Sequence, residues 1–264
     1  MSSLIGRLAG GIWPRRIAMA IFTAVLLYPL VGLLAPVGPW NWNGGLNGST
    51  TSAVHTSLFL TAIAIAIVIA VGTPVALHLA RRAGPERHIW EAALLITVLM
   101  PPLALGLLLT LAFGGHIGVG PWLMRLGVPT SNTPAAFVVT QVYVSIGYYV
   151  VAARAALGAV PRPLEQMAAL LGLRSWAVFW RVTFPLARLG LAAAVSLAWL
   201  RALGEFGAVV VTAYYPAGMP VQIWVNLQDA GLPAVMPLLI VFLLTALPLP
   251  WLIHLFAGNQ AISR

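Results

Sequence analysis

Few side chains in this sequence are suited to acid–base, nucleophilic or metal chemistry. The 264 residues include five acidic residues and five His, and they lack both Cys and Lys. The His residues are scattered over segment ends and loops without the close spacing of a metal site, and no cluster of Ser, His and acid indicates nucleophilic catalysis. Without Lys the chain has no standard phosphate-binding loop. We therefore expect no catalytic residue, metal or cofactor on this chain, and no ATP hydrolysis by it.

The charged pair best suited to a functional role is Arg201 and Glu205. The two residues are four positions apart, on one face of a predicted helix, near the middle of a long apolar segment. A charge at that depth of a membrane costs about 2.5 to 3.5 kcal/mol on insertion scales, so such residues usually face a partner or a wet cavity. We expect the pair to line or brace a transport pathway. The alternative is an ion pair within one helix that only holds the bundle together.

Gly residues beside this pair and Pro residues in the third span could let the helices rock. Gly residues permit close helix approach, and two consecutive Pro residues in the preceding apolar segments remove backbone donors and should bend a helix. Gly and Pro are also frequent in membrane helices for ordinary packing reasons. The hypothesis of a pathway or gate covers Arg201, Gly204, Glu205, Phe206, Gly207, Pro101 and Pro102.

A second candidate site is the polar, Arg-bearing stretch between two apolar segments, from Leu164 to Pro185. Pro161 and Pro163 suit a helix start, and Gly172 is a plausible stop. Apolar residues at helical spacing give a first short helix one apolar face, and the same spacing recurs until Pro185 breaks it. The two sets are Leu164, Met167, Ala168 and Leu171, then Trp176, Phe179, Trp180 and Thr183. Two short helices are predicted, either docking another protein or lying at the lipid interface.

The elements that position these residues are predicted to be membrane-spanning helices. The chain is 61% hydrophobic and only 7% charged, with a mean hydropathy of +0.96, which is typical of an all-α polytopic membrane protein and not of a soluble domain. We expect one membrane domain, residues 1–264, with six helices long enough to cross a bilayer. The predicted spans are Ile17 to Leu34, His55 to Leu79, Ile89 to Leu111, Ala135 to Ala156, Leu189 to Thr212 and Pro233 to Phe256.

The distribution of Arg predicts the orientation of these spans. The net charge is +9, and the 14 basic residues are all Arg. Most of them fall before the first span, between the second and third, and in the connection from Leu157 to Arg188, whereas Arg125 stands alone on the opposite side. By the positive-inside rule, both termini and this connection are cytoplasmic. The positive charge is therefore a topology feature, and nucleic-acid binding is not expected.

The stretch from Leu164 to Pro185 resembles the EAA loop of the membrane subunits of bacterial ATP-binding-cassette importers. That pattern is Glu-Ala-Ala, three residues, Gly, nine residues, then Ile-x-Leu-Pro, and its positions are occupied here by Gln166, Met167, Ala168, Gly172, Val182, Phe184 and Pro185. Gln166 replaces the usual Glu, and Glu165 is a candidate for the missing acid. The resemblance implies that the loop inserts into a groove of an ATPase subunit and transmits nucleotide-driven motion. Its implied coupling residues are Leu164, Glu165, Gln166, Met167, Ala168, Leu171, Gly172, Trp176 and Pro185.

Other segments resemble the molybdate, tungstate and sulfate branch of that family. They begin at Thr56, at Leu99 and at Arg201, and the last, RALGEFGA, is similar to an oxyanion permease signature, whereas the segment from Tyr214 to Trp224 departs from the usual pattern. The resemblance implies a type I importer permease in a bacterial or archaeal plasma membrane. It further implies a second copy of the chain, two ATPase subunits that bind ATP and Mg²⁺, and an external substrate-binding protein.

The cargo implied by this resemblance is a tetrahedral oxyanion, with molybdate or tungstate ahead of sulfate or thiosulfate. Three other functions stay open on the sequence. One is an importer of the same class for ferric iron or thiamine. Another is an ATPase-independent channel or ion-coupled transporter, in which Arg201 and Glu205 would be the relay pair. The third is a membrane-embedded scaffold that has no substrate path.

Overall fold

The computed structural model describes residues 12–34, 47–82, 84–114, 118–127 and 131–246, and these residues contain helices and loops but no strand. This agrees with the predicted all-α class. The helices are α2 (Ile12–Val31), η1 (Gly32–Leu34), α4 (Gly48–Arg81), α5 (Pro85–Leu99), α6 (Pro102–Phe113), α7 (Gly120–Arg125), α8 (Pro134–Gly158), α9 (Arg162–Leu170), α10 (Ser175–Val178), the π turn η2 (Phe179–Thr183), α11 (Phe184–Leu203), α12 (Val209–Thr212), α13 (Met219–Ala230) and α14 (Leu232–Ala246).

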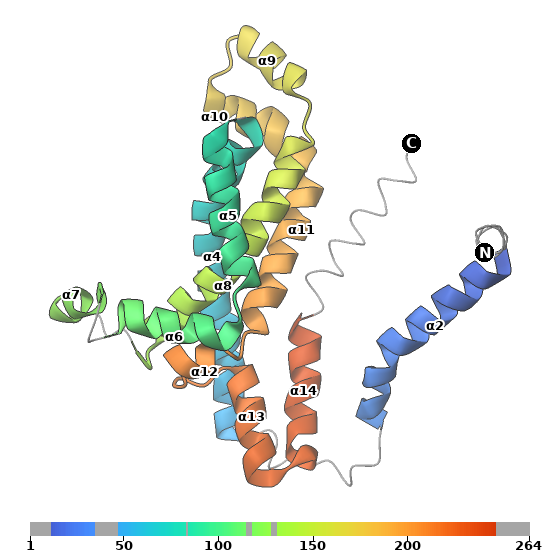
Figure 1. Cartoon of the computed structure of the whole chain (residues 1–264), viewed down its shortest axis with the longest axis vertical. Helices are drawn as coiled ribbons and strands as arrows, with labels where there is room; N and C mark the ends of the chain where they lie inside the picture. Colours follow the sequence, from blue (N-terminus) through green and yellow to red (C-terminus); the bar gives the residue numbers. More distant parts are fainter. Residues whose placement is uncertain (1–11, 35–46, 83, 115–117, 128–130, 247–264) are drawn as a thin grey trace.

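The centre of the molecule is a bundle of α4, α8 and α11, which run along the long axis (Figure 1). Small residues let these helices approach closely, as is usual between membrane helices. Ala153, Ala194 and Ala198 are fully buried between them. A Cβ added at Gly72 would lie 2.7 Å from Cδ1 of Tyr149, and one at Gly190 would lie 2.5 Å from Cβ of Ala156. The bundle is thus held by close backbone packing.

Three helices are long and apolar enough to cross a membrane, namely Gly48–Arg81, Pro134–Gly158 and Ser175–Leu203. They correspond to the second, fourth and fifth predicted spans, although the fifth helix ends at Leu203 instead of Thr212. Shorter apolar helices, Arg16–Val31 and Leu232–Ala246, lie in the first and sixth predicted spans. Residues 247–256 of the sixth span lie outside the described residues.

The third predicted span, Ile89 to Leu111, is not one continuous helix. It consists of two helices, α5 and α6, which meet at an angle of 112°. The break lies where the sequence predicted a bend, because Met100 precedes a Pro and adopts an extended conformation with ψ 132, as the ring of a following Pro requires. Pro101 and Pro102 then start α6, which projects sideways from the bundle (Figure 1).

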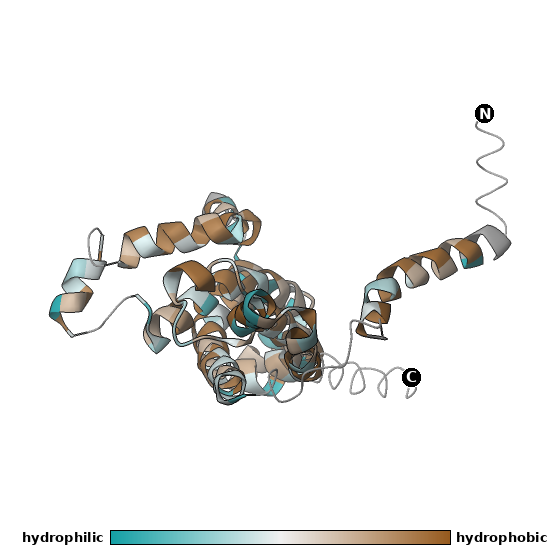
Figure 2. Cartoon of the chain, turned by 90° about the horizontal axis from the view of Figure 1, so that it is seen from below, coloured by the Kyte–Doolittle hydropathy of each residue, from teal (hydrophilic) through white to brown (hydrophobic). Residues whose placement is uncertain are grey.

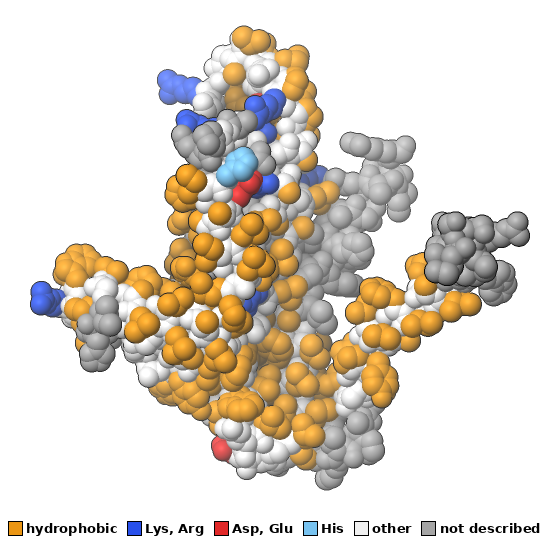
Figure 3. All heavy atoms as spheres, viewed as in Figure 1, with side chains coloured by type: hydrophobic (Ala, Val, Ile, Leu, Met, Phe, Trp, Pro, Cys, Tyr) orange, Lys and Arg blue, Asp and Glu red, His pale blue; other side chains and the backbone are white. Residues whose placement is uncertain are grey.

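Charged and apolar side chains occupy different parts of the surface. On the face shown in Figure 3, most basic side chains gather at the end that carries α9, and hydrophobic side chains cover the body below it. Hydrophobic residues also dominate the projecting helices α2 and α6 (Figure 2). Apolar cover of this extent suits a lipid environment. The end that carries α9 is therefore the part best suited to water and to soluble partners.

Candidate functional site

The first candidate site is the end of the molecule formed by residues 162–185, here called the tip. Its helix α9 begins at Arg162 after Pro161 and ends at Leu170. Gly172 has φ +88, its N–H donates to the carbonyl of Ala169 (2.9 Å), and the N–H of Leu173 donates to the carbonyl of Ala168 (3.2 Å). These two bonds are a Schellman motif, which commonly uses Gly at this position. The predicted helix start and stop are therefore confirmed.

Polar contacts fasten α9 to the end of α4. The Oε1 atom of Glu165 accepts a hydrogen bond from Nη2 of Arg81 (2.6 Å) and another from the hydroxyl of Thr183 (2.5 Å). In return, Nη2 of Arg162 donates to the backbone carbonyl of Arg81 (2.7 Å), so a cation satisfies a carbonyl at the negative end of the α4 dipole. Glu165 thus faces the protein, whereas the neighbouring Gln166 is exposed. The Glu165 carboxylate therefore holds α9 against α4. It does not point outward, as Gln166 does, and so does not replace the acid of the EAA pattern at that position.

The opposite face of α9 is apolar and exposed. Ala168 is 7% exposed, but Met167 is 60% exposed and Leu171 is 84% exposed. Leu164 is also exposed, and Leu170, which lies outside the predicted apolar face, is 87% exposed. Exposed apolar side chains gathered in this way mark an interaction surface. Nothing in the described part of the chain covers them.

The second short helix predicted at the tip is not a separate element. Pro185 was expected to end it, because Pro lacks an N–H and its ring collides with the carbonyl four residues earlier in a regular helix. Instead, the π turn Phe179–Thr183 precedes the Pro, and the N–H of Phe184 donates to the carbonyl of Phe179, five residues back. The wider turn accommodates the ring. Residues Ser175–Leu203 therefore form one continuous 29-residue helix.

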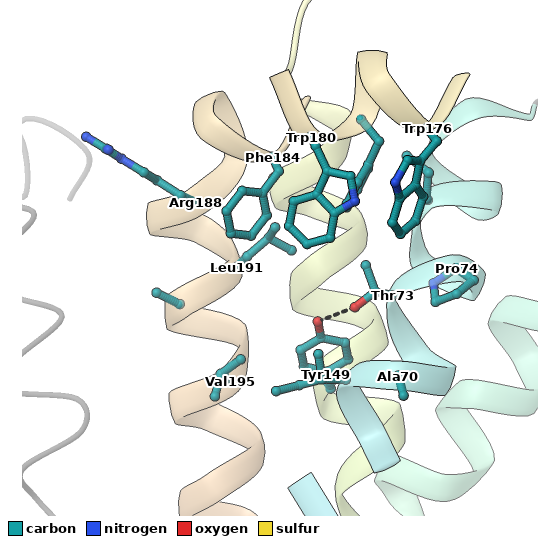
Figure 4. Close-up of a pocket in the computed structure, with 14 residues that line it drawn as sticks. Ala70, Thr73, Pro74, Tyr149, Trp176, Trp180, Phe184, Arg188, Leu191 and Val195 are labelled. Carbon is teal, nitrogen blue, oxygen red and sulfur yellow. Dashed lines mark hydrogen bonds between the residues drawn. The ribbon is translucent and has the colours of Figure 1, made fainter. Parts of the chain in front are cut away.

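Aromatic side chains line the start of this continuous helix. The rings of Phe179 and Trp180 lie 5.2 Å apart, and those of Trp180 and Phe184 lie 5.0 Å apart. Trp176 is 71% exposed and contacts both Phe179 and Trp180. Figure 4 shows Trp176, Trp180 and Phe184 side by side above a groove. The tip thus combines exposed apolar residues of α9 with an aromatic cluster at the head of a membrane helix.

The second candidate site, here called the break, lies where α11 stops. Arg201 is in the last turn of α11, and Glu205 lies beyond its end, so the pair is not inside a continuous helix as the sequence predicted. The Arg201 guanidinium and the Glu205 carboxylate form an ion pair. The other carboxylate oxygen of Glu205 accepts the N–H of Ala208 (2.6 Å), next to the first residue of α12. Because Glu205 is only 3% exposed, its charge depends on these two partners.

Two residues of α8 that the sequence analysis missed support the break. The Tyr148 ring lies under the Arg201 guanidinium, 5.6 Å from ring centroid to Cζ. The amide of Gln141 donates to the hydroxyl of Thr61 in α4 (2.9 Å) and to the carbonyl of Ala202 (3.0 Å). Gln141 and Thr61 are fully buried. Polar residues within apolar spans are rare and usually functional, and this pattern could have identified Gln141.

The Gly and Pro residues predicted for a gate meet at the break. A Cβ added at Gly207 would lie 2.7 Å from Cβ of Pro102, the first residue of α6. Gly204 is less restricted, because the nearest side-chain atom outside α11 is Cζ of Phe242, at 4.0 Å. Phe206 packs against Trp224 of α13 with ring centroids 5.9 Å apart. The broken end of α11 and the bent start of α6 therefore touch each other, with Pro101 immediately before α6.

Among the residues that the structure describes, no three His, Asp or Glu side chains lie close enough together to hold a metal ion. The tip has an exposed apolar surface, and the break has a charged pair inside a helical bundle. These features, with three apolar helices long enough to cross a membrane, define the class as a helical membrane protein.

The chain belongs to the family described as the binding-protein-dependent transport system inner membrane component, whose model matches residues 71–258. It is therefore a permease subunit of an ATP-binding-cassette importer. A solved structure of a bacterial transporter for the acidic polysaccharide alginate has the same fold, with a TM-score of 0.72, 17% identity and coverage of 99% of this chain and 98% of that chain.

Curated relatives are more similar in sequence. A probable molybdenum ABC transporter permease of Haloferax volcanii is 34% identical over 81% of this chain and 78% of its own length. The molybdenum transport permease ModB of Mycobacterium bovis is 32% identical over 80% of each chain. The molybdate/tungstate permease WtpB of Thermococcus kodakarensis is 28% identical over 79% of each. Less similar relatives include proteins named as sulfate permeases.

Proposed function

We propose that this chain forms, with a second copy of itself, the membrane pathway of an importer for a tetrahedral oxyanion. Two ATPase subunits bind ATP and Mg²⁺ on one side, and a substrate-binding protein delivers the cargo on the other. The observation that carries this proposal is the tip, where an apolar face of α9 is exposed while the opposite face is fastened to α4 through Glu165. A firmly held helix with an uncovered apolar face is suited to docking in a groove of another protein.

The tip can transmit motion because it is continuous with a membrane helix. An ATPase subunit would contact Leu164 and Met167 on α9, Leu171 and Gly172 just after it, and Trp176 at the head of the long helix. Movement of the tip would then displace the whole helix as far as Leu203. Binding of ATP, ADP or a loaded receptor would bias the inward- and outward-facing states, since each ligand binds the two states differently.

The proposed topology has six spans, with both termini and the tip in the cytoplasm of a bacterial or archaeal cell. Arg81, Arg162, Arg174 and Arg181 all belong to the end of the molecule that carries the tip, as the positive-inside rule expects for a cytoplasmic end. In this orientation, Tyr214 and Tyr215, which are exposed at the other end, face the receptor.

The break is proposed as part of the gate. Arg201 and Glu205 cancel most of each other's field, so the pair is better suited to bracing a movable helix end than to holding an oxyanion. Contact between Gly207 and Pro102 lets movement of α11 reach the bent α5–α6 pair. Sliding of one helix end against another is a common form of conformational switching.

The proposed cargo is molybdate or tungstate, with sulfate or thiosulfate as the next candidates. The segment RALGEFGA from Arg201 to Ala208 is similar to an oxyanion permease signature, and relatives that are 34% and 32% identical carry molybdenum transport names. Uptake of labelled molybdate, tungstate, sulfate and ferric iron by the reconstituted complex tests the cargo. Transport of iron alone would overturn the oxyanion assignment, and transport without the ATPase would overturn the coupling.

The decisive test of the tip is Gly172→Pro in the complete complex. Proline cannot adopt φ +88 and lacks the N–H that binds Ala169, so the end of α9 must move. We expect receptor binding to persist while receptor-stimulated ATP hydrolysis falls to the basal rate. Gly172→Asn is the matched control, because Asn tolerates this conformation, and it should retain stimulation. Normal stimulation in Gly172→Pro would contradict docking through the tip.

A further inference from the structure

A groove of about 640 Å³ opens on the side of the bundle, just below the tip. It lies between α4, α8 and the head of the long helix Ser175–Leu203 (Figure 4). Its volume is within the range of small-molecule sites. The lining is almost wholly apolar and consists of Ile69, Ala70, Thr73, Pro74, Leu77, Tyr149, Trp176, Phe179, Trp180, Phe184, Arg188, Leu191, Ala192 and Val195.

The polar side chains inside the groove satisfy each other. The hydroxyls of Thr73 and Tyr149 are 2.7 Å apart and form a hydrogen bond (Figure 4). A polar ligand placed inside would lose water without gaining charged partners there, which costs free energy. A hydrocarbon chain has no such cost. The interior therefore favours an apolar occupant.

The rim of the groove has the opposite character. Arg188 extends outward from the rim (Figure 4), is exposed, and has no ion-pair partner among the described residues. Trp176 and Trp180 border the same end of the groove. Trp is enriched where membrane meets water, and basic residues at that depth attract the anionic headgroups of the cytoplasmic leaflet. The cation at the rim thus lies where a phospholipid has its phosphate, and the apolar groove lies where it has its acyl chains.

We propose that this groove binds an anionic phospholipid, with an acyl chain between α4 and the long helix and the phosphate beside Arg188. The site is separate from the import pathway proposed at the break. The bound chain packs against Phe179 and Trp180, which lie at the π turn between the tip and α11. The competing occupant is an apolar helix from a second copy of this chain. Such a helix would not explain the exposed cation Arg188 at the rim.

The test uses Trp fluorescence of the complete complex in phosphatidylcholine nanodiscs that contain a small fraction of brominated phosphatidylglycerol. The reference is the same fraction of brominated phosphatidylcholine. The Trp180→Phe variant identifies the part of the quenching that comes from the groove. We expect brominated phosphatidylglycerol to quench this part more strongly than brominated phosphatidylcholine. Arg188→Gln should reduce the preference about fivefold, which corresponds to about 1 kcal/mol for one basic residue at an anionic surface.

Two further variants separate lipid from protein as the occupant. Ala192→Phe places a ring in the groove and should abolish the specific quenching, whereas Ala193→Phe is the matched control, because Ala193 is exposed and is not part of the lining. Equal quenching by the two brominated lipids, or unchanged quenching in Ala192→Phe, would overturn the proposal. So would a disulfide between two copies of Ala192→Cys, which is readable because the native chain has no Cys.

Discussion

The tip and the break each contain an Arg–Glu ion pair, but the two pairs have different surroundings. At the tip, Arg81 and Glu165 join two elements 84 residues apart, and their side chains are 19% and 17% exposed. At the break, Arg201 and Glu205 are four residues apart across the end of one helix, and the Glu205 side chain is 1% exposed. The first pair fastens an element to its neighbour. The second neutralises a charge that has almost no access to water.

This difference predicts different consequences when each carboxylate is lost. Partly exposed ion pairs typically contribute about 0 to 1 kcal/mol to stability, because water replaces the partner. Removing one member of a buried pair typically costs about 3 to 5 kcal/mol, because the remaining charge stays uncompensated. We therefore expect the Glu165 carboxylate to contribute little to stability, and the Glu205 carboxylate to be required for a stable fold.

Glu205→Gln should have the largest effect. It leaves the Arg201 guanidinium without its counter-charge, and we expect a loss of about 3 kcal/mol in stability, at the lower end of the range because Arg201 keeps some exposure. Thermal unfolding of the purified complex measures this loss, and Glu165→Gln is the matched control with an expected loss of about 1 kcal/mol or less. Equal destabilisation by the two variants would remove the distinction between tip and break. Adding Arg201→Leu to Glu205→Gln should restore part of the stability.

Gly207→Ala should have an intermediate effect. The added Cβ would lie 2.7 Å from Cβ of Pro102, so α6 or the end of α11 must move, at a cost of about 1 to 3 kcal/mol. Gly158→Ala in α8 is the control, because nothing lies within 4 Å of a Cβ added there. We expect transport per assembled complex to fall in the Gly207 variant and to change little in the Gly158 variant. Equal transport by the two variants would show that contact with α6 is not part of the gate.

Leu171→Asp should have the smallest effect on stability and yet a large effect on coupling. Leu171 is 84% exposed, and surface substitutions of this kind usually change stability by no more than about 0.5 kcal/mol. A charge in the apolar docking face should nevertheless weaken ATPase binding and lower receptor-stimulated ATP hydrolysis. Co-purification of the ATPase with the permease measures the binding, with Arg174→Ala as control, because Arg174 is also exposed at the tip and is not among the predicted coupling residues. Undiminished co-purification would show that α9 faces lipid or water instead of the ATPase.

The sequence predicts the tip best where single residues determine the backbone conformation. Pro161, Pro163 and Gly172 fix the start and stop of α9, since Pro restricts φ and Gly adopts the left-handed conformation. Pro101 and Pro102 similarly predict the bend between α5 and α6. The continuity of the long helix through Pro185 was not predictable in this way, because a π turn has no sequence pattern that distinguishes it from an ordinary Pro break.

The end of α11 at Leu203 was missed for a different reason. Residues 206–213 are nearly as apolar as α11 itself, so hydropathy continues across the break, and Gly204 is too common a residue in membrane helices to indicate an end. One local and one distant contact hold the end of the helix: the Glu205 carboxylate accepts the N–H of Ala208, three residues further on, and the amide of Gln141 in α8 donates to the carbonyl of Ala202. The distant contact with Gln141 has no local sequence pattern.

The π turn at Phe179–Thr183 has a mechanical consequence. The helical hydrogen bonding continues from Ser175 to Leu203, although the first turns lie across the head of α11 (Figure 4). The π turn thus changes the direction of the helix without inserting a flexible loop. A sideways push by a motor attached at Trp176 would in this way become a tilt of α11, whose far end is the point where Arg201 meets Glu205.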